Sequence, residues 1–356
     1  MDKSKLEYYD GTKLLSMKDL DGKTPEIFLV TTNRSAGKTV YFSRLLVNKF
    51  LKNKEKFCLI YRFKYELKNC EDKFFKEVGN LFFTDYTMQS ETIAAESFLS
   101  LYLINKKKPE EKLYCGYAVS LNGAENLKRY SHLLSDVKRI FLDEFQSESN
   151  KYCADEIKKF QSLHFSIARG GGEMVRYVPI YMCSNPVSIL NPYYTALGIT
   201  PRLKEDTKFL RGHGYVLEQG FNEITANEQI KSQFNRAFTE DKYLNYSIYG
   251  NYLNDNKAFI EKPAGRNRYI CTIKYKNNDY GVREYYDSGI IYCSSEVDTS
   301  FKLKLSLTTD DHQINYVMIK NNPVIIQNFR FYFERGCFRF QDLNSKEVIT
   351  ELIGYR

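Results

Sequence analysis

The chain has 356 residues, 43% of them hydrophobic, and a formal net charge of +8. This length predicts two domains with buried cores, and the basic balance favours a polyanionic partner. No apolar run approaches the roughly 18 residues of a membrane span, and Met1 to Lys5 lack the apolar core of a signal peptide, so we expect a cytosolic protein that is not inserted in a membrane.

Residues 25–39 predict a phosphate-binding loop. The apolar run from Ile27 to Val30 is typical of a buried strand, and the segment that Gly37 opens has apolar side chains at helical spacing. A loop between a strand and a helix cradles phosphates with its backbone N–H groups, while its lysine reaches the β- and γ-phosphates and its hydroxyl holds Mg²⁺. The expected nucleotide-binding residues are Thr32, Asn33, Arg34, Ser35, Ala36, Gly37, Lys38 and Thr39.

One position departs from the usual motif. The full pattern is G-x-x-x-x-G-K-[ST], and Thr32 stands where its first glycine belongs. The loop must therefore make its turn with a β-branched residue. The alternative is a tight turn that caps a helix and exposes Lys38 without binding a nucleotide.

Further elements follow in the order of an α/β fold. The apolar run at 57–61 predicts a second strand, so that strand, helix and strand form a βαβ unit. Residues 81–122 predict more strands around a basic hairpin at 105–112, whose charges are typical of a solvated turn. Later apolar runs predict buried strands at 140–142 and 178–183, and helical spacing predicts a helix between them at about 155–168.

The sequence changes character after about residue 215. Residues 222–236 predict a polar helix, and 243–256 have few periodic apolar positions, which is typical of a linker. A meander of short strands is expected within 257–309, with a helix at about 324–334 and a last strand at 337–340. We therefore expect a domain of residues 1–215, a helical linker of residues 216–256 and a domain of residues 257–356.

An acidic pair ends one of the predicted strands. Asp143 follows the apolar run at 140–142, and Glu144 comes directly after it. Hydrolysis of a nucleoside triphosphate needs one carboxylate that orders Mg²⁺ and a second that aligns the attacking water. Asp143, together with the Thr39 hydroxyl, suits the first role, and Glu144 suits the second. The alternative is a strand that ends in an acidic turn, but the upstream phosphate loop favours the catalytic interpretation.

Two more side chains complete a catalytic set. Asn185 ends the next predicted strand, where a polar group can sense the γ-phosphate, although it could equally cap a turn before Pro186. Arg169 precedes the glycine run 170–172, whose flexibility would let the guanidinium reach a neighbouring subunit and stabilise the transition state. The alternative for Arg169 is a solvated loop arginine.

The order of these motifs resembles the DNA-encapsidation ATPases of small tailed phages with protein-primed genomes. The resemblance extends over nearly the whole chain, although Thr32 and Ser35 stand where relatives have glycines and the glycines after Arg169 are additional. It rests on Gly37-Lys38-Thr39, 140–145, 167–169 and the specific stretch 184–193, with further similarity at 62–67, 259–262, 307–311 and 336–340.

The resemblance implies a fold, an assembly and a set of roles. The fold is α/β: an additional-strand-catalytic-glutamate (RecA-like) P-loop ATPase domain with a central, mostly parallel sheet, and a smaller α+β domain of RNase H-like topology, a vestigial nuclease. The assembly is a ring of five subunits on the portal of the empty capsid in the host cytoplasm, where ATP and Mg²⁺ drive double-stranded DNA inward and a packaging RNA is bound. Arg169 is implied as a finger acting in trans, Lys128 as a lysine near the nucleotide and Lys64 as a pore residue facing DNA.

Two other functions stay open. A large terminase with an active nuclease would need an aspartate in the first strand of its RNase H-like domain, as part of a cluster that binds two metal ions. The predicted first strand, 269–275, has none, so we expect no nuclease activity. The second alternative is a nucleic-acid- or capsid-binding protein with a degenerate phosphate loop. An intact set of Lys38, Thr39, Asp143 and Glu144 favours an ATPase.

Overall fold

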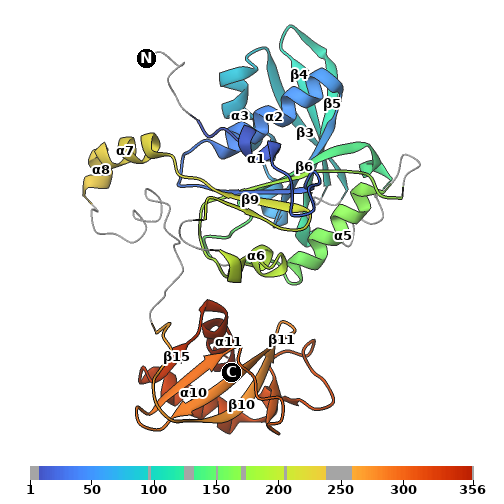
Figure 1. The fold of residues 1–356 in the computed structure, drawn as a ribbon. Helices are drawn as coiled ribbons and strands as arrows, with labels where there is room; N and C mark the ends of the chain where they lie inside the picture. The colour runs from blue at the N-terminus through green and yellow to red at the C-terminus, as the bar shows by residue number, and fades with distance from the viewer. Residues whose placement is uncertain are drawn as a thin grey trace. The chain divides into compact units, whose positions relative to one another are not determined.

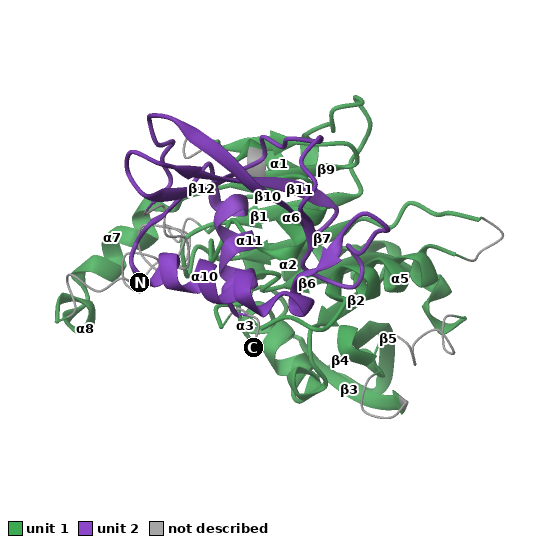
Figure 2. Ribbon diagram, turned by 90° about the horizontal axis from the view of Figure 1, so that it is seen from below, with its two compact units in different colours: residues 1–254 green, residues 255–356 purple. Residues whose placement is uncertain are grey.

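The computed structural model describes residues 8–94, 98–123, 132–149, 151–169, 174–203, 207–237 and 259–354. The chain divides into two compact units, residues 1–254 and 255–356 (Figures 1 and 2). Strand β9 (Tyr215–Gln219) pairs in parallel with β1 (Ile27–Thr31), so the boundary expected after residue 215 falls inside a strand of the first unit. The bounds of the two domains and of the linker stay a prediction.

The first unit is built on a nine-stranded sheet in the order β3-β4-β5-β2-β6-β7-β1-β9-β8. The run from β5 to β9 in this order is parallel, and the outer strands β3, β4 and β8 are antiparallel to their neighbours. Strand β7 lies between β6 and β1, which is the additional strand expected from the family resemblance. The predicted fold class is confirmed. The remaining strands are β2 (Lys56–Tyr61), β3 (Tyr86–Ala94), β4 (Phe98–Asn105), β5 (Lys108–Ser120), β6 (Val137–Asp143), β7 (Ile180–Ser184) and β8 (Phe209–Arg211).

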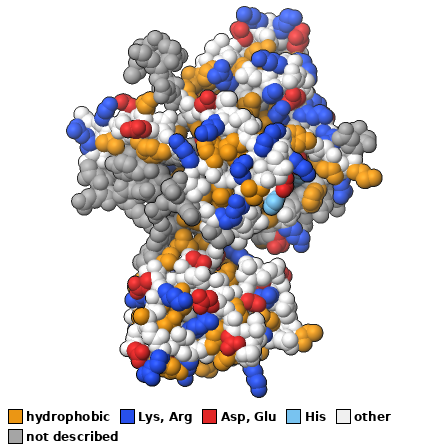
Figure 3. Space-filling model, viewed as in Figure 1, with side chains coloured by type: hydrophobic (Ala, Val, Ile, Leu, Met, Phe, Trp, Pro, Cys, Tyr) orange, Lys and Arg blue, Asp and Glu red, His pale blue; other side chains and the backbone are white. Residues whose placement is uncertain are grey.

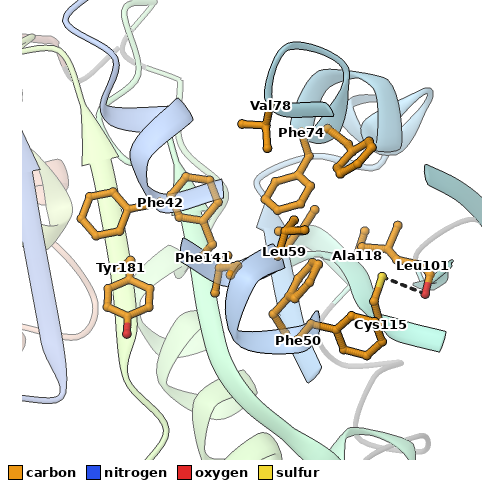
Figure 4. Packing of buried hydrophobic residues seen from close by; sticks show 14 of the residues in the cluster. Phe42, Phe50, Leu59, Phe74, Val78, Leu101, Cys115, Ala118, Phe141 and Tyr181 are labelled. Atoms are coloured by element: carbon orange, nitrogen blue, oxygen red, sulfur yellow. Dashed lines mark hydrogen bonds between the residues drawn. The ribbon is translucent and has the colours of Figure 1, made fainter. Parts of the chain in front are cut away.

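Both faces of the parallel strands are buried, which is why these strands read as continuous apolar runs. Successive residues of β1 alternate between two cores: Phe28 and Val30 belong to one cluster, and Leu29 belongs to the other. The first cluster packs on α2 (Lys38–Asn53) and α3 (Cys70–Phe82), and Phe42 of α2 is stacked on Tyr181 with ring centroids 5.2 Å apart. Both residues are labelled in Figure 4. The second cluster packs on α5 (Glu156–Ala168) and α6 (Pro192–Ala196).

Several elements differ from the sequence expectation. The polar helix expected at 222–236 is two helices, α7 (Glu223–Lys231) and α8 (Gln233–Arg236). The break falls at Ser232, whose hydroxyl accepts the Asn235 N–H at 3.1 Å and so caps α8. Helix α3 and the short α1 (Thr12–Ser16) were not anticipated.

The second unit has a six-stranded sheet in the order β14-β13-β10-β11-β12-β15. Strands β10, β11 and β12 form the expected antiparallel meander, but β13 pairs in parallel with β10, so the meander predicted through residue 309 is wrong for that strand. Parallel strands added beside the first strand of a meander are the RNase H-like arrangement. The strands are β10 (Asn267–Tyr275), β11 (Asn278–Tyr285), β12 (Ile290–Ser294), β13 (Lys304–Ser306), β14 (Val317–Met318) and β15 (Phe338–Phe340).

One face of this sheet carries the core of the second unit. Cys271 and Ile273 of β10 pack with Phe329 of the expected helix, α10 (Pro323–Glu334), and with Ile349 of α11 (Leu343–Gly354), a helix that the sequence analysis did not anticipate. None of the described helices in either unit is both long and apolar enough to cross a membrane.

Candidate nucleotide site

The phosphate loop joins the carboxyl end of β1 to the start of α2, as the motif predicts. Gly37 has a φ of +90°, a left-handed conformation that glycine adopts without strain. A Cβ atom on Gly37 would also lie 2.6 Å from the ring of Tyr8, so the N-terminal segment packs directly on the loop. The glycine of the Gly-Lys-Thr sequence is therefore required both by its backbone angle and by its neighbour.

Lys38 is buried and folds back over the loop. Its Nζ donates to Thr32 Oγ1 at 3.0 Å and to Asn185 Oδ1 at 3.0 Å, and it lies 3.3 Å from the Thr32 carbonyl oxygen and 3.4 Å from that of Asn33. Burial removes the ammonium from water and lowers the pKa of Lys38, while the negative charge of Asp143 opposes this shift. The loop lysine and Asn185, which are 147 residues apart, thus meet at the same edge of the sheet.

The acidic pair lies beside the loop. Thr39 Oγ1 donates to Asp143 Oδ2 at 2.9 Å, so the hydroxyl and carboxylate expected to share a Mg²⁺ ion are in contact. Desolvation, reinforced by the charge of Glu144, raises the pKa of Asp143 to about 6. Glu144 is exposed and has a φ of +53°, a left-handed conformation that costs a non-glycine residue roughly 1–3 kcal/mol.

A buried ion pair holds the turn of Glu144 in place. Arg62, at the end of β2, pairs with Glu156 of α5, with Nε 3.0 Å from each carboxylate oxygen. The Arg62 Nη2 donates to the carbonyl oxygen of Phe145 at 2.9 Å and lies 3.3 Å from that of Glu144. The hydroxyl of Tyr193 completes the network by donating to Glu156 at 2.8 Å. These contacts fix the backbone that carries the acidic pair.

Arg169 lies at the other end of the sheet from this site. It directly follows α5, whose 13 residues span about 20 Å back toward the amino ends of the strands. Arg169 is exposed, makes no hydrogen bond or ion pair with another described residue, and lines a cavity of about 820 Å³ beside Phe165, Met174 and Val175. Arg169 is therefore not brought together with Lys38 or Asp143 of its own chain.

The other predicted site residues occupy different positions. Lys64 is exposed on a short 3₁₀ helix (Lys64–Leu67) after β2, at the same edge of the sheet as the phosphate loop. Arg34 of the loop pairs with Glu148 at 3.2 Å. Lys128 lies outside the described residues.

The model of the podovirus DNA encapsidation protein (Gp16) family matches residues 1–356. The chain belongs to this family. The resemblance drawn from the sequence is thus confirmed. The DNA packaging protein of Bacillus phage phi29 is 25% identical over 356 residues, covering 99% of this chain and 98% of that protein, and that of Bacillus phage B103 is 24% identical over 336 residues, covering 90% and 93%.

Solved structures of packaging motors share the fold of this encapsidation protein. A chain of the bacteriophage Phi-29 viral genome packaging motor assembly has a TM-score of 0.68 at 21% identity, covering 97% of this chain and 99% of that one. A chain of the Phi-28 gp11 DNA packaging motor has a TM-score of 0.60 at 16% identity, covering 98% and 99%.

Sequence reasoning missed some residues that shape the site of this encapsidation protein. Tyr9 donates its backbone N–H to the Ala36 carbonyl of the loop at 2.7 Å and its hydroxyl to Glu218 of β9 at 2.5 Å. Asn33 makes two hydrogen bonds to the backbone of Asn222. Asn33 was expected in the loop, but no motif marks its partner Asn222 or the pair of Tyr9 and Glu218, because these residues reach the loop only through the folding of distant segments around it.

The RNase H-like unit presents a different set of polar side chains. Its first strand, β10, carries Lys274, and Asp279 of β11 accepts the Tyr316 hydroxyl at 3.0 Å and lies 3.4 Å from the Lys274 ammonium. Asp311 accepts the backbone N–H groups of Lys276 and Asn277 at 3.1 and 2.8 Å. Among the described residues, no group of three or more His, Cys, Asp or Glu side chains could hold a metal ion. The expected lack of nuclease activity stays a prediction.

Proposed function

We propose that this encapsidation protein hydrolyses ATP at the carboxyl edge of its large sheet and uses the energy to move double-stranded viral DNA into a preformed capsid. The observation that carries the proposal is the contact of Thr39 with Asp143 beside the buried Lys38, which joins the two halves of a phosphate-hydrolysing site across 104 residues of sequence. Hydroxyl and carboxylate oxygens at this separation suit Mg²⁺, which prefers oxygen ligands.

Each residue of the site has a distinct chemical role in this proposal. The loop from Thr32 to Thr39 binds the phosphates, and Lys38 exchanges its present oxygen partners for the β- and γ-phosphates. Asp143 and Thr39 hold Mg²⁺, which neutralises the charge that develops on the phosphates. Glu144 orients the attacking water and accepts its proton, and Asn185, in contact with Lys38, senses the γ-phosphate.

Arg169 completes the site in trans. Arg169, at the end of the sheet opposite to Lys38 of its own chain, cannot reach a nucleotide bound there, but it can reach one held by the next subunit of a head-to-tail ring. The exposure of Arg169 and its lack of a partner among the described residues leave its charge available for that contact. Lys128 is proposed to act near the same nucleotide.

The partners follow from the family and from charge. We propose a ring of five subunits that sits on the capsid portal in the host cytoplasm, binds the packaging RNA and encircles DNA. Exposed Lys64 contacts DNA phosphates, and on the face drawn in Figure 3 the Lys and Arg side chains are scattered over the larger unit, which suits binding without sequence preference. A large terminase with an active nuclease and a binding protein that does not hydrolyse ATP are the alternatives.

A first experiment compares Lys38→Ala with Lys52→Ala, a control at the exposed end of the same helix α2. Lys38→Ala should lose ATP binding in equilibrium dialysis and fill no capsids in a DNA packaging assay, whereas Lys52→Ala should keep both. ATP bound with the wild-type affinity by Lys38→Ala would contradict the proposed site. Cleavage of plasmid DNA by the wild-type protein with Mn²⁺ would instead favour the nuclease alternative.

A second experiment tests the role of Arg169 in trans. Loss of an arginine finger lowers the rate on the order of 10³- to 10⁵-fold, so Arg169→Ala rings should be nearly inactive although they bind ATP. Glu144→Gln rings should also be inactive. Mixed rings should recover ATP turnover at interfaces that pair the intact arginine with the intact glutamate. Activity of Arg169→Ala alone, or no recovery in mixed rings that assemble, would place the finger elsewhere.

A further inference from the structure

The phosphate loop is joined to helix α7 through Asn33. This side chain is fully buried, and both of its polar atoms bind the backbone of one residue, Asn222. The Asn222 N–H donates to Asn33 Oδ1 at 2.9 Å, and Asn33 Nδ2 donates to the Asn222 carbonyl oxygen at 3.0 Å, across 189 residues of sequence. Asn222 is the N-cap of α7, and its own side chain accepts the Thr225 N–H at 2.9 Å. Movement of Asn33 must therefore carry the first turn of α7 or break two hydrogen bonds.

The segment just before Asn222 leaves no room for the loop to move alone. The Gly220 N–H donates to the Thr31 carbonyl at 2.8 Å, which continues the pairing of β1 with β9. A Cβ atom on Gly220 would lie 3.0 Å from Cγ2 of Thr32, so the Thr32 side chain packs against the backbone of Gly220. A shift of Thr32 or Asn33 thus presses directly on the chain that leads into α7.

Nucleotide binding changes the contacts of these same two residues. In the structure, the Lys38 ammonium lies within 3.4 Å of the carbonyl oxygens of Thr32 and Asn33. When phosphates take the ammonium, these carbonyl oxygens lose their cation and face an anion, which repels them. The two peptide groups must then turn or shift. The loop therefore makes different contacts with and without nucleotide, as a ligand-driven shift between two conformations requires.

Helix α7 is suited to respond. Ala226 is its one fully buried residue, and Figure 1 shows α7 and α8 projecting from the body of the larger unit. An element with few buried contacts moves at a low cost in free energy.

We infer that Asn33 couples nucleotide binding in the phosphate loop to a displacement of α7. The inference rests on the proposed ATP site. Asn33 acts as a positioning residue: it touches no reacting atom, and it passes the rearrangement of Thr32 and Lys38 to the start of the helix. Because coupling between sites is reciprocal, a change at α7 also alters the affinity of the loop for nucleotide.

Hydrogen–deuterium exchange of the α7 amides, with and without a non-hydrolysable ATP analogue and Mg²⁺, tests the coupling in the full-length protein. In the wild type, the nucleotide should change the exchange rates in α7 by about fivefold or more, the lower end of typical coupling between sites. Asn33→Leu, which keeps the size of the side chain and removes both hydrogen bonds, should abolish that change when it is compared at analogue concentrations that saturate each protein. Asn222→Ser is the matched control, because serine also caps helices and the backbone groups that bind Asn33 remain; its response should equal that of the wild type.

Binding of the analogue is measured in the same samples. If the wild type does not bind it, the proposed ATP site fails and the coupling fails with it. If the wild type binds it and α7 exchange does not change, or if Asn33→Leu keeps the full change, the coupling is wrong and the ATP site stands. Should Asn33→Leu fold poorly or lose binding, Asn33→Ser replaces it, because the shorter side chain cannot span both backbone groups, and the same outcomes decide.

Discussion

The two units of this encapsidation protein use their carboxylates in opposite ways. In the larger unit, Asp143 contacts a hydroxyl and lies beside a second acid, Glu144, and its pKa is raised to about 6. In the smaller unit, Asp279 and Asp311 accept hydrogen bonds from a tyrosine, a threonine and backbone groups, and Asp279 also lies near Lys274. Carboxylates with strongly shifted pKa values are found more often at functional sites, whereas carboxylates that accept several internal hydrogen bonds stabilise the fold.

The first prediction contrasts a buried ion pair of the larger unit with an exposed pair of the smaller one. Arg62→Ala should lower the free energy of unfolding by about 3–5 kcal/mol, because it leaves the Glu156 charge buried without its partner. Arg268→Ala should have a far smaller effect, since Arg268 is exposed in its pair with the half-buried Glu284. Urea denaturation followed by circular dichroism gives both values. Equal costs for the two substitutions would contradict the contrast.

The second prediction exchanges one aspartate in each unit for asparagine. Asp143→Asn should slow Mg²⁺-dependent ATP turnover on the order of 100-fold or more, because a catalytic metal ion supplies several kcal/mol of transition-state stabilisation. Asp279→Asn should leave turnover within about twofold of the wild type and change the thermal stability instead. The comparison fails if Asp279→Asn slows turnover as much as Asp143→Asn does.

Only part of this site could be predicted from the sequence. Lys38, Thr39 and Asp143 could be placed together because parallel strands of an α/β sheet end at one edge, where motif residues that follow each strand must meet. The bonds of Asn33 to Asn222 could not, because a polar residue that bonds to a distant backbone leaves no periodic or motif signal. The domain boundary expected after residue 215 falls inside β9 for a related reason. Glu218 and Gln219 are polar, and their place in the sheet depends on pairing with β1.

The third prediction concerns DNA and asks whether its contacts lie on the larger unit. Lys64→Ala should weaken binding to all duplex sequences alike and reduce the slope of log affinity against log salt by about 0.9, the value for one lost phosphate contact. Lys107→Ala, on the hairpin at 105–112, is the control, since the exposed Lys107 side chain pairs with Asp85 at 3.4 Å. The salt slope of this variant should equal that of the wild type. Filter binding at several salt concentrations measures both slopes. A change confined to one DNA sequence would count against a phosphate contact.

The fourth and smallest effect is the pH dependence of stability. Because the pKa of Asp143 is raised in the folded protein, the folded state binds more protons than the unfolded one between about pH 4 and 6, and stability from this group falls as the pH rises through that window. Asp143→Asn removes this pH-dependent loss of stability. Without Mg²⁺ and nucleotide, the stability of the variant relative to the wild type should therefore increase from pH 4 to pH 7 by about 1–2 kcal/mol, measured as a relative increase in melting temperature. A constant difference across this range would show that the carboxyl group titrates normally.

The central claim is that the acidic pair at the edge of the large sheet hydrolyses ATP, and Glu144 tests it most directly. Glu144→Gln keeps the size and hydrogen-bonding capacity of the side chain and removes the base. Equilibrium binding and steady-state turnover of ATP should be measured together on this variant and on Glu110→Gln, a control on the exposed hairpin. We expect Glu144→Gln to bind ATP as the wild type does and to turn it over on the order of 10²- to 10⁴-fold more slowly, the usual contribution of a general base. Turnover within about tenfold of the wild type, a difference of only about 1.4 kcal/mol, would contradict the claim.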